Sequence, residues 1–141
     1  MKTITFKKEI NAPIQKVWDA LWDKDNYSEW TKHFAPSSKY ESDWKVGGKT
    51  LFLGPNNDGL ISTITKLDVP KEVIFNHLAD IVNGVEGNSF GISGFEKYEL
   101  KEIDGVTTLV ISLDISEEYE QDMSEGFTKG LEEVKRIAEK K

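Results

Sequence analysis

His77 is the polar side chain with the clearest chemical potential in this sequence. It lies in the mainly apolar segment 73–78, within the predicted strand 72–78, where it shares a face with Val73 and Phe75. Histidine changes its charge near neutral pH, so an imidazole facing a cavity could act as an acid–base catalyst or bind a polar ligand group. The alternative is a hydrogen-bonded or exposed histidine at the end of a strand.

Glu96 and Tyr98 form a second polar pair on another predicted strand, at residues 94–103. They alternate with Lys97 and Glu99, so Glu96 and Tyr98 share one face. A glutamate beside a tyrosine at the mouth of a cavity could orient a substrate. The alternative is a glutamate that simply faces solvent at the strand end.

Other chemistry has little support. The chain lacks cysteine, and its two histidines, His33 and His77, lie far apart, so a zinc site would need additional carboxylates. It lacks phosphate-binding and dinucleotide-binding glycine motifs. Ser93 is flanked by glycines in Gly91-Ile92-Ser93-Gly94, but their spacing is not that of a nucleophile elbow. We therefore expect no metal, no cofactor and no assigned catalytic residue.

The composition of the chain limits the classes of partner that can be expected. The 141 residues fit a single domain over 1–141, and 18 basic against 25 acidic residues give a net charge of −7. An acidic chain without a basic stripe is a poor partner for nucleic acid or an anionic membrane. The sequence has no apolar run long enough to span a bilayer, and its start lacks the apolar core of a signal peptide. The cytoplasm is the expected location.

The secondary-structure pattern is mostly strand and turn between helical ends. Alternation and turn signals predict strands at 4–10, 40–44, 50–53, 60–67, 72–78, 94–103 and 106–115, the last two joined by a hairpin at Asp104-Gly105. A helix beginning at Pro13 should bury Val17 and Leu21, and a break at 23–26 should precede a short helix at 27–30. The glycine-punctuated segment 79–92 reads as a loop that could gate a cavity, or as a loose hairpin end.

A long amphipathic helix is predicted at 119–140. Its apolar stripe contains Met123, Phe127 and Leu131, so the Phe127 ring should point at the concave face of the sheet. Gly126 and Gly130 are unusual there, because each costs about 1 kcal/mol relative to alanine inside a helix. We expect them to let the helix pass close to the sheet; room above a cavity is the alternative.

Several ordered motifs resemble one family over nearly the whole chain. They are Ala12-Pro13-x-x-x-Val17-Trp18-x-Ala20-Leu21, Tyr27-x-x-Trp30, Val46-Gly47-Gly48, Pro70-Lys71-x-Val73 and Gly126-Phe127-x-x-Gly130-Leu131-x-x-Val134-Lys135. Together they resemble the START-like (SRPBCC) superfamily, in particular the group named after the C-terminal domain of the activator of Hsp90 ATPase. Relatives commonly carry tryptophan where Phe127 stands. The resemblance implies an α+β helix-grip fold, a curved antiparallel sheet wrapped around a long C-terminal helix, with a hydrophobic cavity between them.

The resemblance implies several functions. We expect binding of a small hydrophobic or amphipathic molecule or lipid, rather than catalysis. The alternatives are a co-chaperone-like domain for an Hsp90-type ATPase, or a polyketide cyclase- or aromatase-like enzyme that uses His77, Glu96 and Tyr98. The candidate cavity-lining residues are Trp30, Phe34, Phe52, Phe75, His77, Glu96, Tyr98, Leu113, Met123 and Phe127.

Overall fold

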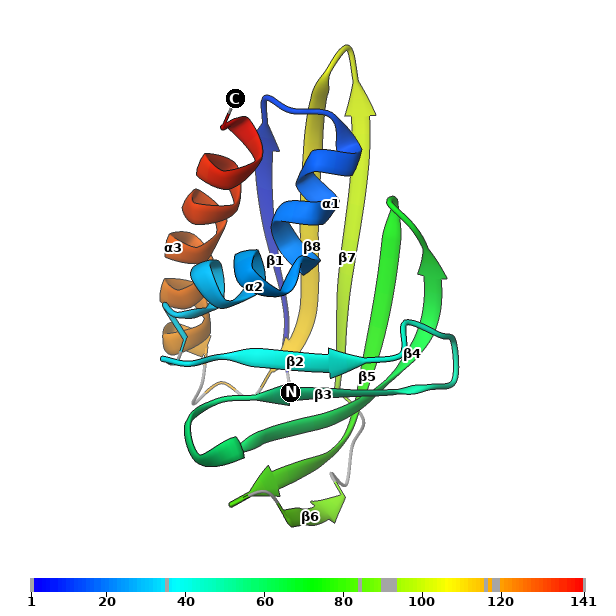
Figure 1. The fold of residues 1–141 in the computed structure, drawn as a ribbon, viewed down its shortest axis with the longest axis vertical. Helices are drawn as coiled ribbons and strands as arrows, with labels where there is room; N and C mark the ends of the chain where they lie inside the picture. The colour runs from blue at the N-terminus through cyan, green and yellow to red at the C-terminus, as the bar shows by residue number, and fades with distance from the viewer. Residues whose placement is uncertain are drawn as a thin grey trace.

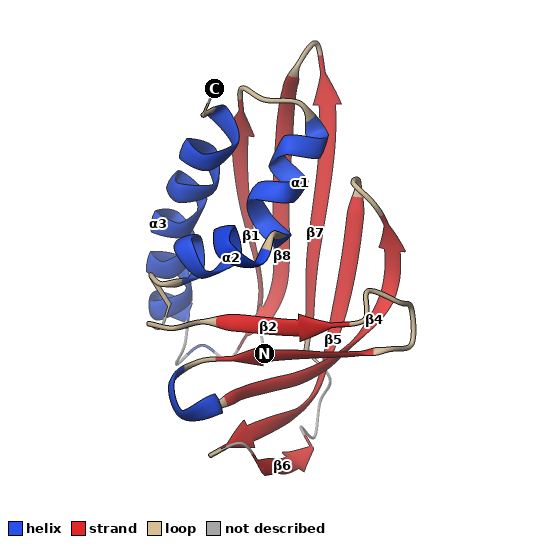
Figure 2. Cartoon of the chain, viewed as in Figure 1, coloured by secondary structure: helices blue, strands red, loops and turns tan. Residues whose placement is uncertain are grey.

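The computed structural model describes residues 2–34, 36–83, 85–89, 94–115, 117 and 120–140, with side chains undescribed at 86–89. Figures 1 and 2 show the described helices and strands in two colourings. In chain order they are β1 (Lys2–Ile10), α1 (Ile14–Trp22), α2 (Lys24–Thr31), β2 (Lys39–Ser42), β3 (Lys49–Leu53), the short 3-10 helix η1 (Pro55–Asn57), β4 (Gly59–Asp68), β5 (Glu72–Val82), β6 (Val85–Ser89), β7 (Phe95–Ile103), β8 (Val106–Ile115) and α3 (Glu120–Glu139).

The strands form one antiparallel sheet in the order β1-β8-β7-β5-β4-β3-β2, with β6 paired to β5. The sheet twists so strongly that β2 and β3 run across the direction of β1, β8 and β7, while α1, α2 and α3 cover one face (Figure 1). This is the α+β helix-grip fold that the sequence predicts. The concave face of the sheet and the three helices enclose both the core and the candidate site.

The core lies where the alternating strands meet the helices. Tyr98 of β7 and Leu109 and Ile111 of β8 are buried, while Glu99 and Lys101 on the opposite face are exposed. The predicted two-sided β7–β8 hairpin is therefore confirmed. One face is apolar because it packs against the helices, and the other is charged because it meets solvent.

The break between the first two helices is shorter than predicted. Only Asp23 separates α1 from α2, so α2 begins at Lys24 and not near Tyr27. Asp23 caps α2, because its Oδ1 accepts a hydrogen bond from the backbone N–H of Asp25 at 3.2 Å. The polar run reads as a helix breaker in the sequence, but it is a capped helix start.

The segment predicted as a long loop, residues 79–92, is largely strand. β5 continues to Val82, and β6 begins at Val85 and pairs back onto β5. The hairpin alternative is therefore the one observed over the described part of this segment. Gly84, residues 90–93 and with them Ser93 lie outside the described residues, as does Tyr119 at the predicted start of the last helix.

The two glycines of α3 allow close packing, but against a different partner from the one predicted. A Cβ placed on Gly130 would lie 3.0 Å from the Trp30 carbonyl oxygen, and a Cβ on Gly126 would lie 2.5 Å from the Phe34 ring. At Gly126 and Gly130, helix α3 therefore packs closely against α2 and the residues that follow α2, and not against the sheet. This contact brings aromatic rings from both segments together beside a cavity.

Candidate functional site

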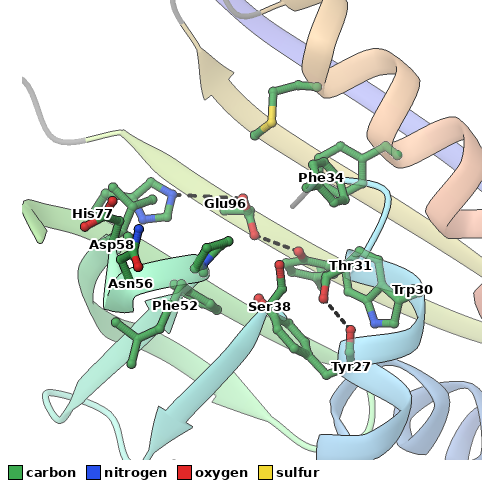
Figure 3. A pocket seen from close by; sticks show the side chains of 18 residues that line it. Tyr27, Trp30, Thr31, Phe34, Ser38, Phe52, Asn56, Asp58, His77 and Glu96 are labelled. Atoms are coloured by element: carbon green, nitrogen blue, oxygen red, sulfur yellow. Dashed lines mark hydrogen bonds and ion pairs between the residues drawn. The ribbon is translucent and has the colours of Figure 1, made fainter. Parts of the chain in front are cut away.

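A cavity of about 480 Å³ lies between the α2 region, the start of α3 and the strongly bent part of the sheet. This volume is within the usual range of small-molecule sites. Figure 3 shows the side chains that line it. The lining residues are Tyr27, Trp30, Thr31, Phe34, Ser38, Phe52, Leu53, Gly54, Pro55, Asn56, Asp58, Gly59, Leu60, His77, Glu96, Tyr98, Met123 and Phe127.

One wall is a cluster of three aromatic rings. Phe34 lies against Phe127 with ring centroids 4.8 Å apart, and Trp30 lies 6.2 Å from Phe34 and 6.3 Å from Phe127. The Trp30 indole N–H donates to the Leu21 carbonyl at 2.9 Å, which fixes the ring while leaving its polar atom satisfied. The rings therefore present a rigid apolar surface to the cavity.

His77 of β5 and Glu96 of β7 place two ionisable side chains on the cavity wall, from strands that pair with each other. The Tyr98 hydroxyl donates to Glu96 Oε2 at 2.6 Å, and His77 Nδ1 shares a hydrogen bond of 2.7 Å with the Ser62 hydroxyl. His77 Nε2 lies 4.0 Å from Glu96 Oε1. Figure 3 places Glu96 between His77 and the aromatic side chains. The His77 and Glu96 side chains are only 13% and 14% exposed, so they face the cavity and not open solvent.

An irregularity in the β4–β5 pairing positions Ser62 beside His77. The register shifts between Ile61, which pairs with Ala79, and Ser62, which pairs with His77. Ile61 and Ser62 are both buried, although strict alternation would turn one of them outward. Such irregularities re-aim side chains. Because Ser62 is 0% exposed, its hydroxyl orients the imidazole and is out of reach as a nucleophile.

The two tyrosines of the cavity are neutral at physiological pH. Burial, and then the nearby Glu96 carboxylate, raise the pKa of Tyr98 well above 10.0. Burial also raises the pKa of Tyr27, with smaller contributions from Glu96 and Tyr40. Both phenols therefore keep their protons and act as hydrogen-bond donors or polar surfaces, not as bases.

The predicted lining residues fall into two groups. Trp30, Phe34, Phe52, His77, Glu96, Tyr98, Met123 and Phe127 lie on the cavity wall. Phe75 and Leu113 do not. Phe75 is fully buried behind the wall, with its ring 5.1 Å from Phe52 and 6.3 Å from Tyr98, and Leu113 belongs to the same buried core. They share strand faces with His77 and Glu96, but they pack within the core, where the Phe52 and Tyr98 rings lie against Phe75.

Sequence reasoning missed several wall residues. Tyr27 could have been found, because it precedes Trp30 by three residues and so shares its helix face. Asp58 and Leu60 lie on the wall only because η1 and β4 fold over it, and no local sequence pattern predicts this arrangement. The contribution of Ser62 depends on the register shift.

The arrangement provides an apolar wall with few polar groups, and Glu96 and His77 can hydrogen-bond a ligand. Within the described ranges, no three His, Asp or Glu side chains are grouped so that they could hold a metal ion. None of the described helices is long and apolar enough to cross a membrane.

Comparison with known proteins assigns the family. Residues 11–139 match the family model described as activator of Hsp90 ATPase homolog 1-like protein. The chain belongs to this family. Its motifs at Pro13, Trp30 and Phe127 lie within the matched range, so the resemblance predicted from them is confirmed. A comparison with curated proteins gives no significant match.

Solved structures share the family fold at low sequence identity. Protein CV1439 from Chromobacterium violaceum is 16% identical with a TM-score of 0.73, and the alignment covers 100% of both chains. CalU16 from Micromonospora echinospora is 17% identical with a TM-score of 0.68, covering 97% of this chain and 76% of CalU16. DynU16, from the dynemicin biosynthetic locus, is 14% identical with a TM-score of 0.73, covering 97% of this chain and 47% of DynU16. At these identities the likeness concerns the fold alone.

Proposed function

We propose that this chain binds a small hydrophobic or amphipathic molecule in the cavity between sheet and helices. The observation that carries the proposal is the cavity of about 480 Å³, whose wall is mainly aromatic and apolar with a few polar groups. Ligand sites have this composition, because apolar contact supplies affinity and isolated polar groups set orientation. The Trp30–Phe34–Phe127 cluster is fixed by packing, so little ordering would accompany binding.

A cavity-filling substitution tests the proposal. Leu60→Trp places an indole in the wall, whereas Ile103→Trp adds the same ring at an exposed site in the β7–β8 hairpin. Binding of the neutral fluorescent dye Nile red, and the rise in melting temperature that bound decanol produces, would be measured for both variants. We expect Leu60→Trp to weaken dye binding at least about tenfold, which is about 1.4 kcal/mol, and Ile103→Trp to leave it unchanged.

Equal dye binding by the two variants would place the dye outside the cavity. Absence of any dye or metabolite binding by the unmodified protein, across a broad lipid and metabolite screen, would end the proposal.

A cyclase- or aromatase-like enzyme is the second candidate, favoured by the convergence of His77 and Glu96 on the cavity. DynU16, which shares the fold, comes from a biosynthetic locus. Polyketide-synthase genes beside the gene for this chain would support the enzyme. In that case His77→Ala should abolish turnover of the neighbouring pathway's intermediate while Nile red binding persists. Retained turnover in His77→Ala would remove His77 from the chemistry.

A co-chaperone role rests on the family's description. It is tested by ATPase stimulation and pull-down with the Hsp90-type chaperone of the same cell, and no binding would end it. A cytoplasmic location and a single domain over 1–141 remain predictions, testable by cell fractionation and limited proteolysis.

A further inference from the structure

The charge of the cavity wall is one-sided. Asp58 and Glu96 are its carboxylates and His77 is its imidazole, while no lysine or arginine is among the described lining residues. Asp58 is exposed at the rim, and its Oδ1 accepts a hydrogen bond from the backbone N–H of Asn83 at 2.6 Å. Glu96 is therefore the carboxylate that faces the interior of the cavity.

Glu96 keeps hydrogen-bonding capacity toward that interior. Its Oε2 accepts from Tyr98 at 2.6 Å, but its Oε1 has His77 Nε2 at 4.0 Å, which is beyond hydrogen-bond distance. The opposite edge of the imidazole is bound to Ser62, which limits how far the ring can turn toward Glu96. The Glu96 side chain is only 14% exposed, so its carboxylate gains most from a hydrogen-bond donor that enters with the ligand, and a charged donor forms the strongest such bond.

The aromatic surroundings favour the same type of partner. The ring centroids of Phe52 and His77 lie 6.3 Å apart. Trp30, Phe34 and Tyr27 add further aromatic rings to the wall of the cavity that Glu96 also lines. Aromatic faces attract cations through their quadrupole, most strongly in desolvated sites. A ligand carboxylate or phosphate would instead meet Glu96 and Asp58 without a lysine or arginine among the described lining residues to pair with it.

On the basis of the proposed function above, we infer that the preferred ligand class is hydrophobic amines. The ammonium group donates to Glu96 Oε1, and the apolar part lies against Trp30, Phe34 and Phe127. A fatty acid of the same length binds more weakly, because its carboxylate is repelled where the ammonium is attracted.

Three ligands that share a decyl chain and differ only in the head group test this inference. Decylamine, decanol and decanoate would each displace Nile red from the unmodified protein near neutral pH. We expect decylamine to bind tightest and decanoate weakest, with at least about a tenfold difference in dissociation constant between them, which is about 1.4 kcal/mol. This order needs no variant, so it holds as a test even if a variant folds poorly.

Glu96→Gln then identifies the responsible group. The amide keeps an acceptor for the Tyr98 hydroxyl but removes the charge, so decylamine should bind about tenfold more weakly while decanol changes little. Glu99→Gln is the matched control, because it removes the same charge from the same strand on the exposed face and should alter neither ligand. The melting temperature of each variant would report its folding.

The outcomes separate this inference from the proposed function. If none of the three decyl compounds displaces the dye, the amine preference fails, whereas the proposed function fails only if the broad dye, lipid and metabolite screen also shows no binding. If decanol or decanoate binds as tightly as decylamine, or if Glu96→Gln leaves decylamine binding unchanged, the cavity binds apolar ligands but the amine preference is overturned.

Discussion

Replacing Phe127 with alanine tests whether this ring borders an existing cavity or fills a closed core. The ring is 2% exposed, and it contacts Phe6 at 4.9 Å and Phe34 at 4.8 Å between centroids. Loss of its burial alone accounts for about 1.5–3 kcal/mol. In a closed core the new void would raise the total to about 3–5 kcal/mol. Because Phe127 lines the cavity, its void merges with existing space, and we expect a loss of only about 2 kcal/mol.

Phe75→Ala is the matched control. Its ring is also buried, at 0% exposure, but it lies behind the wall and outside the cavity, so its removal should cost the full 3–5 kcal/mol or so. Urea unfolding would give both free energies, and Nile red titration would give ligand affinity. Phe127→Ala should also change dye affinity, since it reshapes the wall. Equal losses for the two variants, with dye affinity unchanged in Phe127→Ala, would refute a cavity at this position.

Two further predictions concern close packing and pH. Gly130→Ala should lower the free energy of unfolding by about 1 kcal/mol, because the clash of the new methyl group with the Trp30 carbonyl outweighs the gain in helix propensity. Lys129→Ala, at an exposed neighbouring position, is the control. An increase in the stability of Gly130→Ala would contradict the close contact. Burial and Glu96 raise the pKa of Tyr98 well above its ordinary value of 10.0, so the unfolded chain loses the phenol proton at a lower pH than the folded chain does. The stability that this difference contributes is present below pH 10. It should fall as the pH rises above 10, by up to about 1.4 kcal/mol per pH unit. Tyr98→Phe should reduce this slope in urea unfolding, while Tyr27 and Tyr40, whose pKa values burial also raises, continue to contribute to it. An unchanged slope would argue against a buried Tyr98.

The strands and the closing helix were predictable because their signals are local. Alternation over residues 106–115 predicts β8 with its observed bounds, Val106–Ile115, and the stripe through Phe127 and Leu131 predicts α3 to within a residue at its C-terminal end. The errors in the predicted secondary structure lie where the same local residues are compatible with two different structures. Asp23 was read as part of a helix breaker but caps a helix, and the segment containing Gly87 was read as a loop although Gly87 lies in β6.

The sequence by itself determined the chemical groups available to the site: aromatic rings, the imidazole of His77, and a Glu96–Tyr98 pair two residues apart on one strand face. Only the tertiary structure decided which of them meet. Phe75 and His77 share a strand face, yet packed aromatic rings cover the first, while the second lies on the cavity wall. The packing of Gly130 against Trp30, and the register shift that brings Ser62 to His77, depend on contacts between distant segments, which no local periodicity can encode.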